Sequence, residues 1–175
     1  EALSPESPKT RGTAQNDDIY FQTRELANRY YDAIPDIVAE YLKEISKITG
    51  RDYKPFNYYG DPHATRVVIA MGSVTQTLEE VVDHLRAKGE KVGVLKVHLY
   101  RPFSLKYLFD VMPETVEKIA VLDRTKEPGS LGEPLYLDVK AAFYGRKNQP
   151  VIVGGRYGLS SKDVDPAQML AVFEN

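Results

Sequence analysis

The sequence predicts a three-layer α/β fold, in which a mainly parallel β-sheet lies between helices on both of its faces. Two observations support this. Four short apolar runs, at residues 66–71, 92–99, 118–122 and 150–153, are typical of buried strands. Amphipathic helical segments separate these runs, and such alternation favours parallel strands joined by right-handed crossovers.

Length and composition limit the classes of protein that fit. The chain has 175 residues and a net charge of −2, which gives no electrostatic reason to expect nucleic acid or an anionic membrane as a partner. Its apolar runs are far shorter than the roughly 20 residues of a membrane span. It contains no cysteine, which excludes disulfides, thiolate catalysis and iron–sulfur ligation within this chain. Without a signal peptide, this favours the cytoplasm.

The N-terminal part is expected to lie outside the sheet. Residues 1–18 read as a linker or arm without regular structure, because proline, glycine and polar residues dominate them. We expect residues 19–175 to form a single domain. Since Glu1 is not a methionine, the chain is expected to have been cut from a longer polypeptide.

Residues 19–48 have a helical pattern and are expected to cover the sheet as extra helices. Pro35 suits the first turn of the longer helix, and Gly50 suits its end. The residues expected on one apolar stripe of this helix are Ile37, Val38, Tyr41, Leu42, Ile45 and Ile48. An aromatic segment before it is expected to cover the edge of a core rather than form a ligand cage, and it contains Tyr20, Phe21, Tyr30 and Tyr31.

The remaining elements follow in order along the chain. Residues 51–65 read as a connector with turn chemistry. After the first strand, a helix that ends near Gly89 is predicted to bury Val74, Leu78, Val81, Val82 and Leu85. Ser104 is expected to cap a short helix with an apolar face of Leu105, Leu108, Phe109 and Met112. Further helices are predicted at residues 133–144 and 166–173.

Ligands and partners of open parallel sheets meet the loops that leave the carboxyl ends of the strands, so these loops hold the candidate sites. After the first strand, Gly72 and Ser73 could hold an anion at a helix N-terminus, or Ser73 or a neighbour could simply cap the helix. After the second strand, Arg101 before Pro102 could bind a carboxylate or phosphate, or pair with an acid nearby.

The most informative segment follows the third strand. It combines charged residues with glycines that permit close backbone approach. Its candidate residues are Asp123, Arg124, Thr125, Lys126, Glu127, Gly129 and Gly132. The segment suits a domain interface, direct contact with a ligand, or an ordinary surface loop. As weak cofactor-binding candidates we retain Gly72, Ser73, Arg124, Lys126 and Gly129.

A fourth loop, residues 154–158, is predicted after the last strand. Its Arg156 and Tyr157 could anchor a neighbouring domain, or the segment could be a simple loop. The histidines, His63, His84 and His98, have no ligand near them at metal spacing. The sequence shows neither a nucleophile–base pair nor a metal-ligand cluster, so we predict no catalytic and no metal-binding residue in this chain.

These loops resemble pyruvate:ferredoxin (flavodoxin) oxidoreductases, and specifically their second core domain, which has the transketolase C-terminal fold. The matching stretches are residues 10–16, 18–22, 55–60, 70–74, 99–103, 121–137 and 154–159. They span nearly the whole chain in the expected order, so the resemblance is specific.

The resemblance implies a part of a large cytoplasmic enzyme that converts pyruvate and coenzyme A into acetyl-CoA and CO₂. It implies thiamine diphosphate, Mg²⁺, [4Fe–4S] clusters and coenzyme A as cofactors, all held mainly by other domains. It also implies ferredoxin or flavodoxin as electron acceptor and a homodimeric full enzyme. This chain would then be inactive alone and serve as a structural domain. The alternative is a module that itself binds coenzyme A or another anionic ligand.

Overall fold

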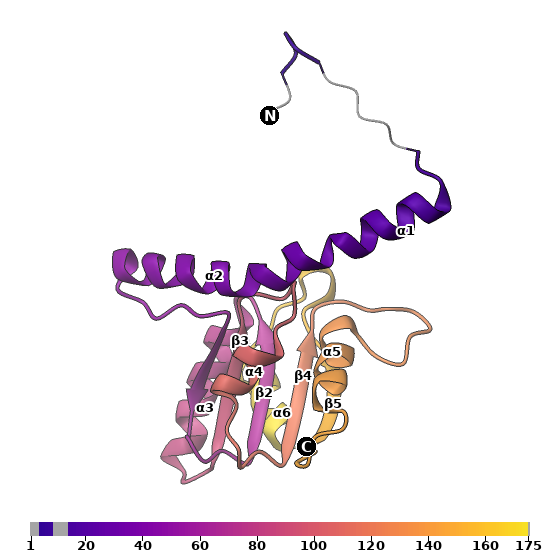
Figure 1. Cartoon of the computed structure of the whole chain (residues 1–175). Helices are drawn as coiled ribbons and strands as arrows, with labels where there is room; N and C mark the ends of the chain where they lie inside the picture. The colour runs from indigo at the N-terminus through magenta and orange to yellow at the C-terminus, as the bar shows by residue number, and fades with distance from the viewer. Residues whose placement is uncertain (1–3, 9–13, 175) are drawn as a thin grey trace. The chain divides into compact units, whose positions relative to one another are not determined.

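The computed structural model describes residues 4–8 and 14–174 (Figure 1). Part of the predicted arm, and part of the matching stretch at residues 10–16, lie outside the described residues. The chain divides into two compact units, with the boundary between Ile34 and Pro35. The predicted division into an arm and a single domain from residue 19 stays a prediction.

Two helices lie at the start of the described chain. Helix α1 spans Asp17–Leu26 and α2 spans Asn28–Thr49. The expectation of no regular structure up to residue 18 is wrong at its end, because α1 already begins at Asp17. Two acidic residues in the first turn of α1 favour this start, since they complement the positive end of the helix dipole.

The position of Pro35 differs from the prediction. It lies inside α2 and not in its first turn, because the helix already begins at Asn28. A proline within a helix removes one backbone N–H, but Pro35 is also the residue of α2 that is buried, so its ring gains apolar contacts. The predicted end of the helix is confirmed: Gly50 has a φ of 71° and donates its N–H to the Ser46 carbonyl.

A five-stranded sheet forms the centre of the unit that begins at Pro35. The strands are β1 (Phe56–Gly60), β2 (Arg66–Met71), β3 (Val92–Val97), β4 (Lys118–Asp123) and β5 (Val151–Arg156). Their order across the sheet is β1-β3-β2-β4-β5. Strand β1 runs antiparallel to β3, and the other pairs are parallel. This confirms the predicted α/β class with a mainly parallel sheet.

Two segments predicted as loops are strands. Phe56–Gly60, within the expected connector, forms the edge strand β1. The turn residues on either side of it, such as Pro55, masked a run of aromatic residues that suits a pleated edge. The loop predicted at residues 154–158 also begins too early, because Gly154 to Arg156 pair with the end of β4. Glycines tolerate this extended pairing where a ring packs against them.

Helices cover both faces of the sheet (Figure 1). Helices α4 (Leu105–Val111) and α5 (Pro134–Phe143) pack on one face, where the core includes Ile69, Leu95 and Val121. Helices α3 (Val74–Ala87) and α6 (Pro166–Glu174) pack on the other, against Val68 and Val94. All five apolar residues predicted for α3 are buried, namely Val74, Leu78, Val81, Val82 and Leu85.

Two details of the short helix α4 were predicted incorrectly. Leu105 belongs to its expected apolar face but is exposed, since it occupies the first helical position and faces away from the core. Ser104 stands at the N-cap position, yet its side chain forms no capping hydrogen bond.

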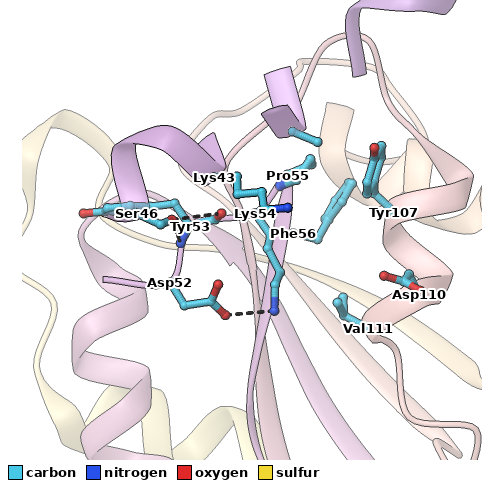
Figure 2. Close-up of a pocket in the computed structure, with 11 residues that line it drawn as sticks. Lys43, Ser46, Asp52, Tyr53, Lys54, Pro55, Phe56, Tyr107, Asp110 and Val111 are labelled. Atoms are coloured by element: carbon cyan, nitrogen blue, oxygen red, sulfur yellow. Dashed lines mark hydrogen bonds and ion pairs between the residues drawn. The ribbon is translucent and has the colours of Figure 1, made fainter. Parts of the chain in front are cut away.

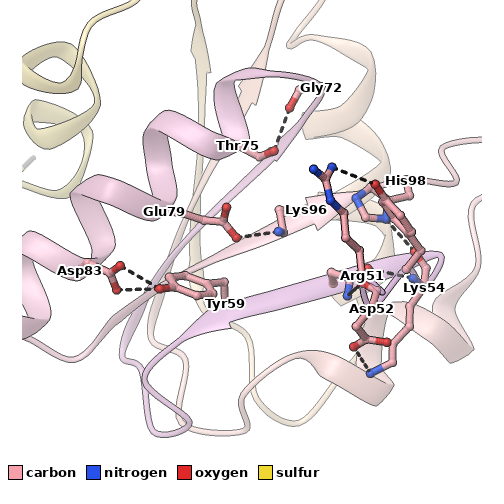
Figure 3. A network of polar contacts seen from close by, with 12 residues as sticks. Arg51, Asp52, Lys54, Tyr59, Gly72, Thr75, Glu79, Asp83, Lys96 and His98 are labelled. Atoms are coloured by element: carbon pink, nitrogen blue, oxygen red, sulfur yellow. Dashed lines mark hydrogen bonds and ion pairs between the residues drawn. The ribbon is translucent and has the colours of Figure 1, made fainter. Parts of the chain in front are cut away.

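Polar contacts join α3 to the sheet near its antiparallel edge. The Tyr59 hydroxyl donates to the Asp83 carboxylate at 2.8 Å, and Lys96 Nζ lies 2.6 Å from Glu79 Oε1 (Figure 3). Each contact links a strand to a helix distant in sequence, so together they fix how α3 lies on β1 and β3.

Candidate functional site

The candidate site is built on the strand-end loop, by which we mean residues 123–133 between β4 and α5. Asp123 ends β4, and its carboxylate accepts hydrogen bonds from the backbone N–H groups of Leu135 at 3.0 Å and Tyr136 at 3.1 Å. It therefore caps the start of α5 from a position ten residues before Glu133, which occupies the N-cap position itself. Burial raises the pKa of Asp123, while the two backbone hydrogen bonds oppose that shift.

Glu133, at the other end of the loop, is buried, and two cationic side chains lie near its carboxylate. One carboxylate oxygen accepts the Glu127 N–H at 2.8 Å. The other accepts a hydrogen bond from Arg156 on β5, with Lys126 Nζ further away at 4.0 Å. The Glu127 N–H and the Arg156 guanidinium hold the pKa of Glu133 below its usual value. The anion is thus fixed at the base of the loop.

The beginning of the loop is tied to the end of β5. Arg124 Nε donates to the Gly158 carbonyl at 3.0 Å. The Tyr157 N–H donates to the Asp123 carbonyl, and the Tyr157 hydroxyl donates to the Met71 carbonyl at 3.1 Å. Because Met71 ends β2, these bonds connect the carboxyl ends of three strands.

The ring of Tyr136 explains two of the glycines. A β-carbon on Gly132 would lie 2.2 Å from this ring, and one on Gly154 would lie 2.9 Å from it. The ring therefore packs closely against backbone from the loop and from β5. Gly129 serves differently, since its φ of 80° lies in the region that favours glycine.

Arg101 forms a separate cluster with α5. Its guanidinium lies 2.7 Å from Asp138 Oδ2 and stacks over the Tyr100 ring. The Tyr100 hydroxyl donates to the same carboxylate at 2.9 Å. Burial, together with this hydrogen bond to Asp138, raises the pKa of Tyr100 to about 12. The structure thus shows Arg101 paired with an acid inside the domain, which was one of its two predicted roles.

The turn after β2 holds the last predicted site. Ser73 stands at the N-cap of α3, but its side chain makes no capping hydrogen bond. A neighbour bonds there instead, because Thr75 Oγ1 donates to the Gly72 carbonyl at 2.8 Å (Figure 3). Gly72 and Ser73 are both exposed.

The structure therefore brings several predicted residues together and leaves others apart. The predicted residues that lie in the strand-end loop or contact it are Arg124, Lys126, Glu127, Gly132, Arg156 and Tyr157. Thr125 is half-buried within it. The prediction missed Glu133 as the anion that pairs with Arg156, and Asp138 as the anion that pairs with Arg101. For Glu133, its position directly before α5 was a usable signal, since a buried strand end and a helix start converge there.

Sequence comparison identifies the family. A sequence profile described as pyruvate:ferredoxin oxidoreductase core domain II matches residues 64–169, which extend from just before β2 into α6. The chain belongs to this family. The predicted resemblance is thereby confirmed. Strands β2 to β5 and the strand-end loop lie within the matched region, and β1 lies before it.

Core domain II is a small part of the curated relatives. The chain is 62% identical over 174 residues to a pyruvate-flavodoxin oxidoreductase of Enterobacter agglomerans. This alignment covers 99% of the chain but 15% of that protein. It is 55% identical to a pyruvate:ferredoxin oxidoreductase of Moorella thermoacetica, with the same shares. The chain thus spans about 15% of the length of these relatives.

A solved structure supports the fold. The structure is that of a 2-oxoglutarate:ferredoxin oxidoreductase from Magnetococcus marinus with 2-oxoglutarate, coenzyme A and succinyl-CoA bound. The structural match covers 75% of this chain and 21% of the chain of that enzyme. The TM-score is 0.50 and the identity 20%. At this identity the likeness concerns the fold of core domain II alone.

Chemically, the site of core domain II is a set of compensated charges. Within it, Arg124 bonds a backbone carbonyl and Arg156 bonds a carboxylate of the same domain. Among residues 4–8 and 14–174, no group of three or more histidine or acidic side chains is arranged to hold a metal ion. In the same described part of the chain, no helix is long and apolar enough to cross a membrane.

Proposed function

We propose that this chain is a non-catalytic structural and interface domain of a thiamine diphosphate-dependent pyruvate:ferredoxin or pyruvate:flavodoxin oxidoreductase. The enzyme converts pyruvate and coenzyme A into acetyl-CoA and CO₂ and passes electrons to ferredoxin or flavodoxin. The observation that carries the proposal is the match to core domain II together with the 15% share of relatives named for this activity. A chain that spans 15% of the length of its relatives is consistent with one structural domain among several.

The internal pairing of the strand-end loop supports a non-catalytic role. Arg124 bonds the Gly158 carbonyl, and Arg156 bonds Glu133, so both guanidinium groups already have partners within the domain. Such pairing fixes the loop at the carboxyl edge of the sheet. A rigid mount of this kind lets neighbouring domains hold reacting groups in a defined geometry.

Cofactors are assigned to the rest of the proposed enzyme. The chain has no cysteine, so its residues do not fit a [4Fe–4S] cluster, which needs thiolate ligands. Thiamine diphosphate, Mg²⁺ and the main coenzyme A site are likewise assigned to other domains, and no reaction step is assigned to residues of this chain. On the strength of the family, we propose that the enzyme is a cytoplasmic homodimer.

The tip of the strand-end loop is the part we propose to dock against a neighbouring domain. Leu131 is 97% exposed there, so a neighbour can cover its side chain without displacing any contact at the base of the loop. Arg101, Arg124, Thr125, Lys126, Glu127, Gly132, Arg156 and Tyr157 remain the interface candidates. Most of them hold the loop in place, while Leu131 is free to meet the neighbour.

Substitution in the full-length enzyme tests this role. Leu131→Ser removes the exposed apolar tip, and Lys126→Ala removes a cation with only a distant internal partner. We expect each to weaken assembly or turnover while the domain stays folded. Lys147→Ala, on an exposed turn after α5, is the control. Unchanged assembly and kinetics in both test variants would contradict a docking role for the loop.

Calorimetric titration of the chain with coenzyme A tests the competing assignment as a binding module. We expect no heat up to about millimolar ligand, which corresponds to binding weaker than roughly −4 kcal/mol. Saturable binding would instead show that the domain holds part of a cofactor site by itself. Thiamine diphosphate with Mg²⁺ is titrated separately under the same conditions.

A further inference from the structure

The part of α2 that belongs to the second compact unit, from Pro35 to Thr49, carries the most distinctive exposed surface in that unit. Four large side chains are exposed on it, namely Ile37, Tyr41, Ile45 and Ile48. Tyr41 is 67% exposed and Ile48 is 84% exposed. We call these four residues the outer face of α2. Single exposed apolar residues are common, but a row of four along one helix marks an interaction site.

The apolar surface of α2 is wider than its own domain needs. At about 100° per residue, the outer face occupies an arc of about 80°. Val38, Leu42 and Ser46 fall on the adjoining arc and are half-buried. One apolar stripe of about 100° is enough to face one core. A surface about twice that wide is expected of a helix buried on two sides. The sequence prediction of one stripe that covers the sheet was therefore wrong for its outer half.

Polar contacts fix the rotation of the helix. Asp36 accepts hydrogen bonds from Lys106 and from the Tyr107 hydroxyl, both at 2.7 Å. Further along, Ser46 Oγ accepts the Tyr53 N–H at 2.8 Å. These contacts lie at both ends of the segment and join it to α4 and to the residues before β1. The helix cannot turn its outer face inward without breaking them.

The inner side of the helix is already engaged. A cavity of about 330 Å³ lies between it and the domain, lined by Lys43 and Ser46 of α2, by residues 52–56 and by Tyr107 of α4 (Figure 2). In the same view Asp52 and Lys54 pair with each other at 2.8 Å. None of the four residues of the outer face lines this cavity, and all four are exposed, so the outer face lies apart from the contacts on the inner side.

We infer that the outer face of α2 is a docking surface for another part of the same long polypeptide, which presents an apolar surface to it. This rests on the proposed function. The alignment with the curated relatives includes α2, because it covers 99% of this chain, and leaves about 85% of their length outside the match. That length supplies the partner. Glu40 and Glu44 border the outer face, so cations are expected at the rim of the partner surface.

Hydroxyl-radical footprinting read by mass spectrometry tests the inference. Tyr41 is labelled in the 175-residue chain and in the full-length enzyme, with the exposed Tyr144 as the high reference and the half-buried Tyr58 as the low one. We expect Tyr41 to label like Tyr144 in the chain and to fall to the level of Tyr58 in the enzyme. Labelling of Tyr41 that stays equal in both overturns the inference.

Two further outcomes are decisive. Protection of Tyr41 in the isolated chain that grows with protein concentration assigns the face to a second copy and overturns the inference. A substitution gives independent evidence: Tyr41→Ser should weaken assembly of the enzyme, whereas Lys47→Gln, at an exposed polar position of the same helix, should not. If Tyr41 stays labelled while Leu131→Ser still lowers turnover, the inference fails and the proposed function stands.

Discussion

The strand-end loop and the outer face of α2 are both at the surface, but their side chains are satisfied in opposite ways. In the loop, Glu133 accepts hydrogen bonds from the Glu127 N–H and from Arg156, and Arg124 bonds a carbonyl. On α2, Tyr41 and Ile48 project apolar surface into solvent. The polar groups of the loop already have hydrogen-bond partners within the domain, whereas the outer face of α2 has few polar groups and a large exposed apolar surface.

This contrast changes where an interface is sought. Charged groups that compensate each other gain little from a partner, because the partner must first replace contacts that exist. Uncovered apolar surface gains free energy in proportion to the area removed from water. We therefore expect the helix face to supply most of the binding free energy of the assembled enzyme, and the loop to supply position.

The largest effect on stability is expected at the base of the strand-end loop. Asp123→Ala removes a buried carboxylate that accepts two backbone N–H groups at the start of α5, and should cost about 2–3 kcal/mol. Asp165→Ala is the control, since Asp165 caps α6 in the ordinary way at an exposed site and should cost about 1 kcal/mol. Urea denaturation measures both. Equal costs would show that the distant cap is no stronger than a local one.

The next effect concerns the packing of Tyr136. Gly132→Ala places a β-carbon 2.2 Å from the ring and should destabilise the fold by about 1–2 kcal/mol. Gly154→Ala, at 2.9 Å from the same ring, should cost less. Thermal unfolding of each variant is compared with its counterpart in a Tyr136→Ala background, where the clash is absent. A cost of Gly132→Ala that is the same in both backgrounds contradicts this explanation.

A smaller, pH-dependent effect is expected for Glu133. Its pKa in the fold lies below the usual value of 4.5, so its ionised form contributes stability that is present above pH 4.5 and is lost as the pH falls below it. Glu133→Gln should therefore lower stability at neutral pH and matter less in acid. Denaturation at a series of pH values measures this, with Glu127→Gln as the control because Glu127 contributes its backbone N–H. A pH-independent cost would mean that charge is not what holds the loop.

The sequence predicted the parts of the fold that depend on apolar patterning. The strand at Arg66–Met71 and the buried side of α3 were identified because a two-sided sheet needs continuous apolar runs and a helix needs a regular stripe. Strand β1 was missed because it has only five residues, begins directly after Pro55 and ends in Gly60. The apolar pattern also identified α2. It could not show which of its apolar residues are buried within the domain and which are exposed, since periodicity indicates that a helix face is apolar and not what packs against it.

The candidate site was predicted in part for a similar reason. The family resemblance and strand-end geometry located the loop, but pairings such as Arg156 with Glu133 join residues 23 positions apart. Which cation meets which anion depends on how β5 registers against β4, where Asp123 lies beside Arg156. A prediction that ended the last strand at residue 153 does not contain this register.

The smallest effect is expected on the outer face of α2, and its smallness is informative. Ile48→Ser should change the stability of the chain by no more than about 0.5 kcal/mol, because an exposed side chain loses few contacts. Leu42→Ser, on the half-buried side of the same helix, is the matched comparison and should cost more. Urea denaturation of both variants measures the difference. If Ile48→Ser costs as much as Leu42→Ser, the outer face is already covered within the chain. The expected result, a negligible cost in the chain, would mean that this apolar surface contributes nothing to the fold of the domain and leaves its free energy available for association.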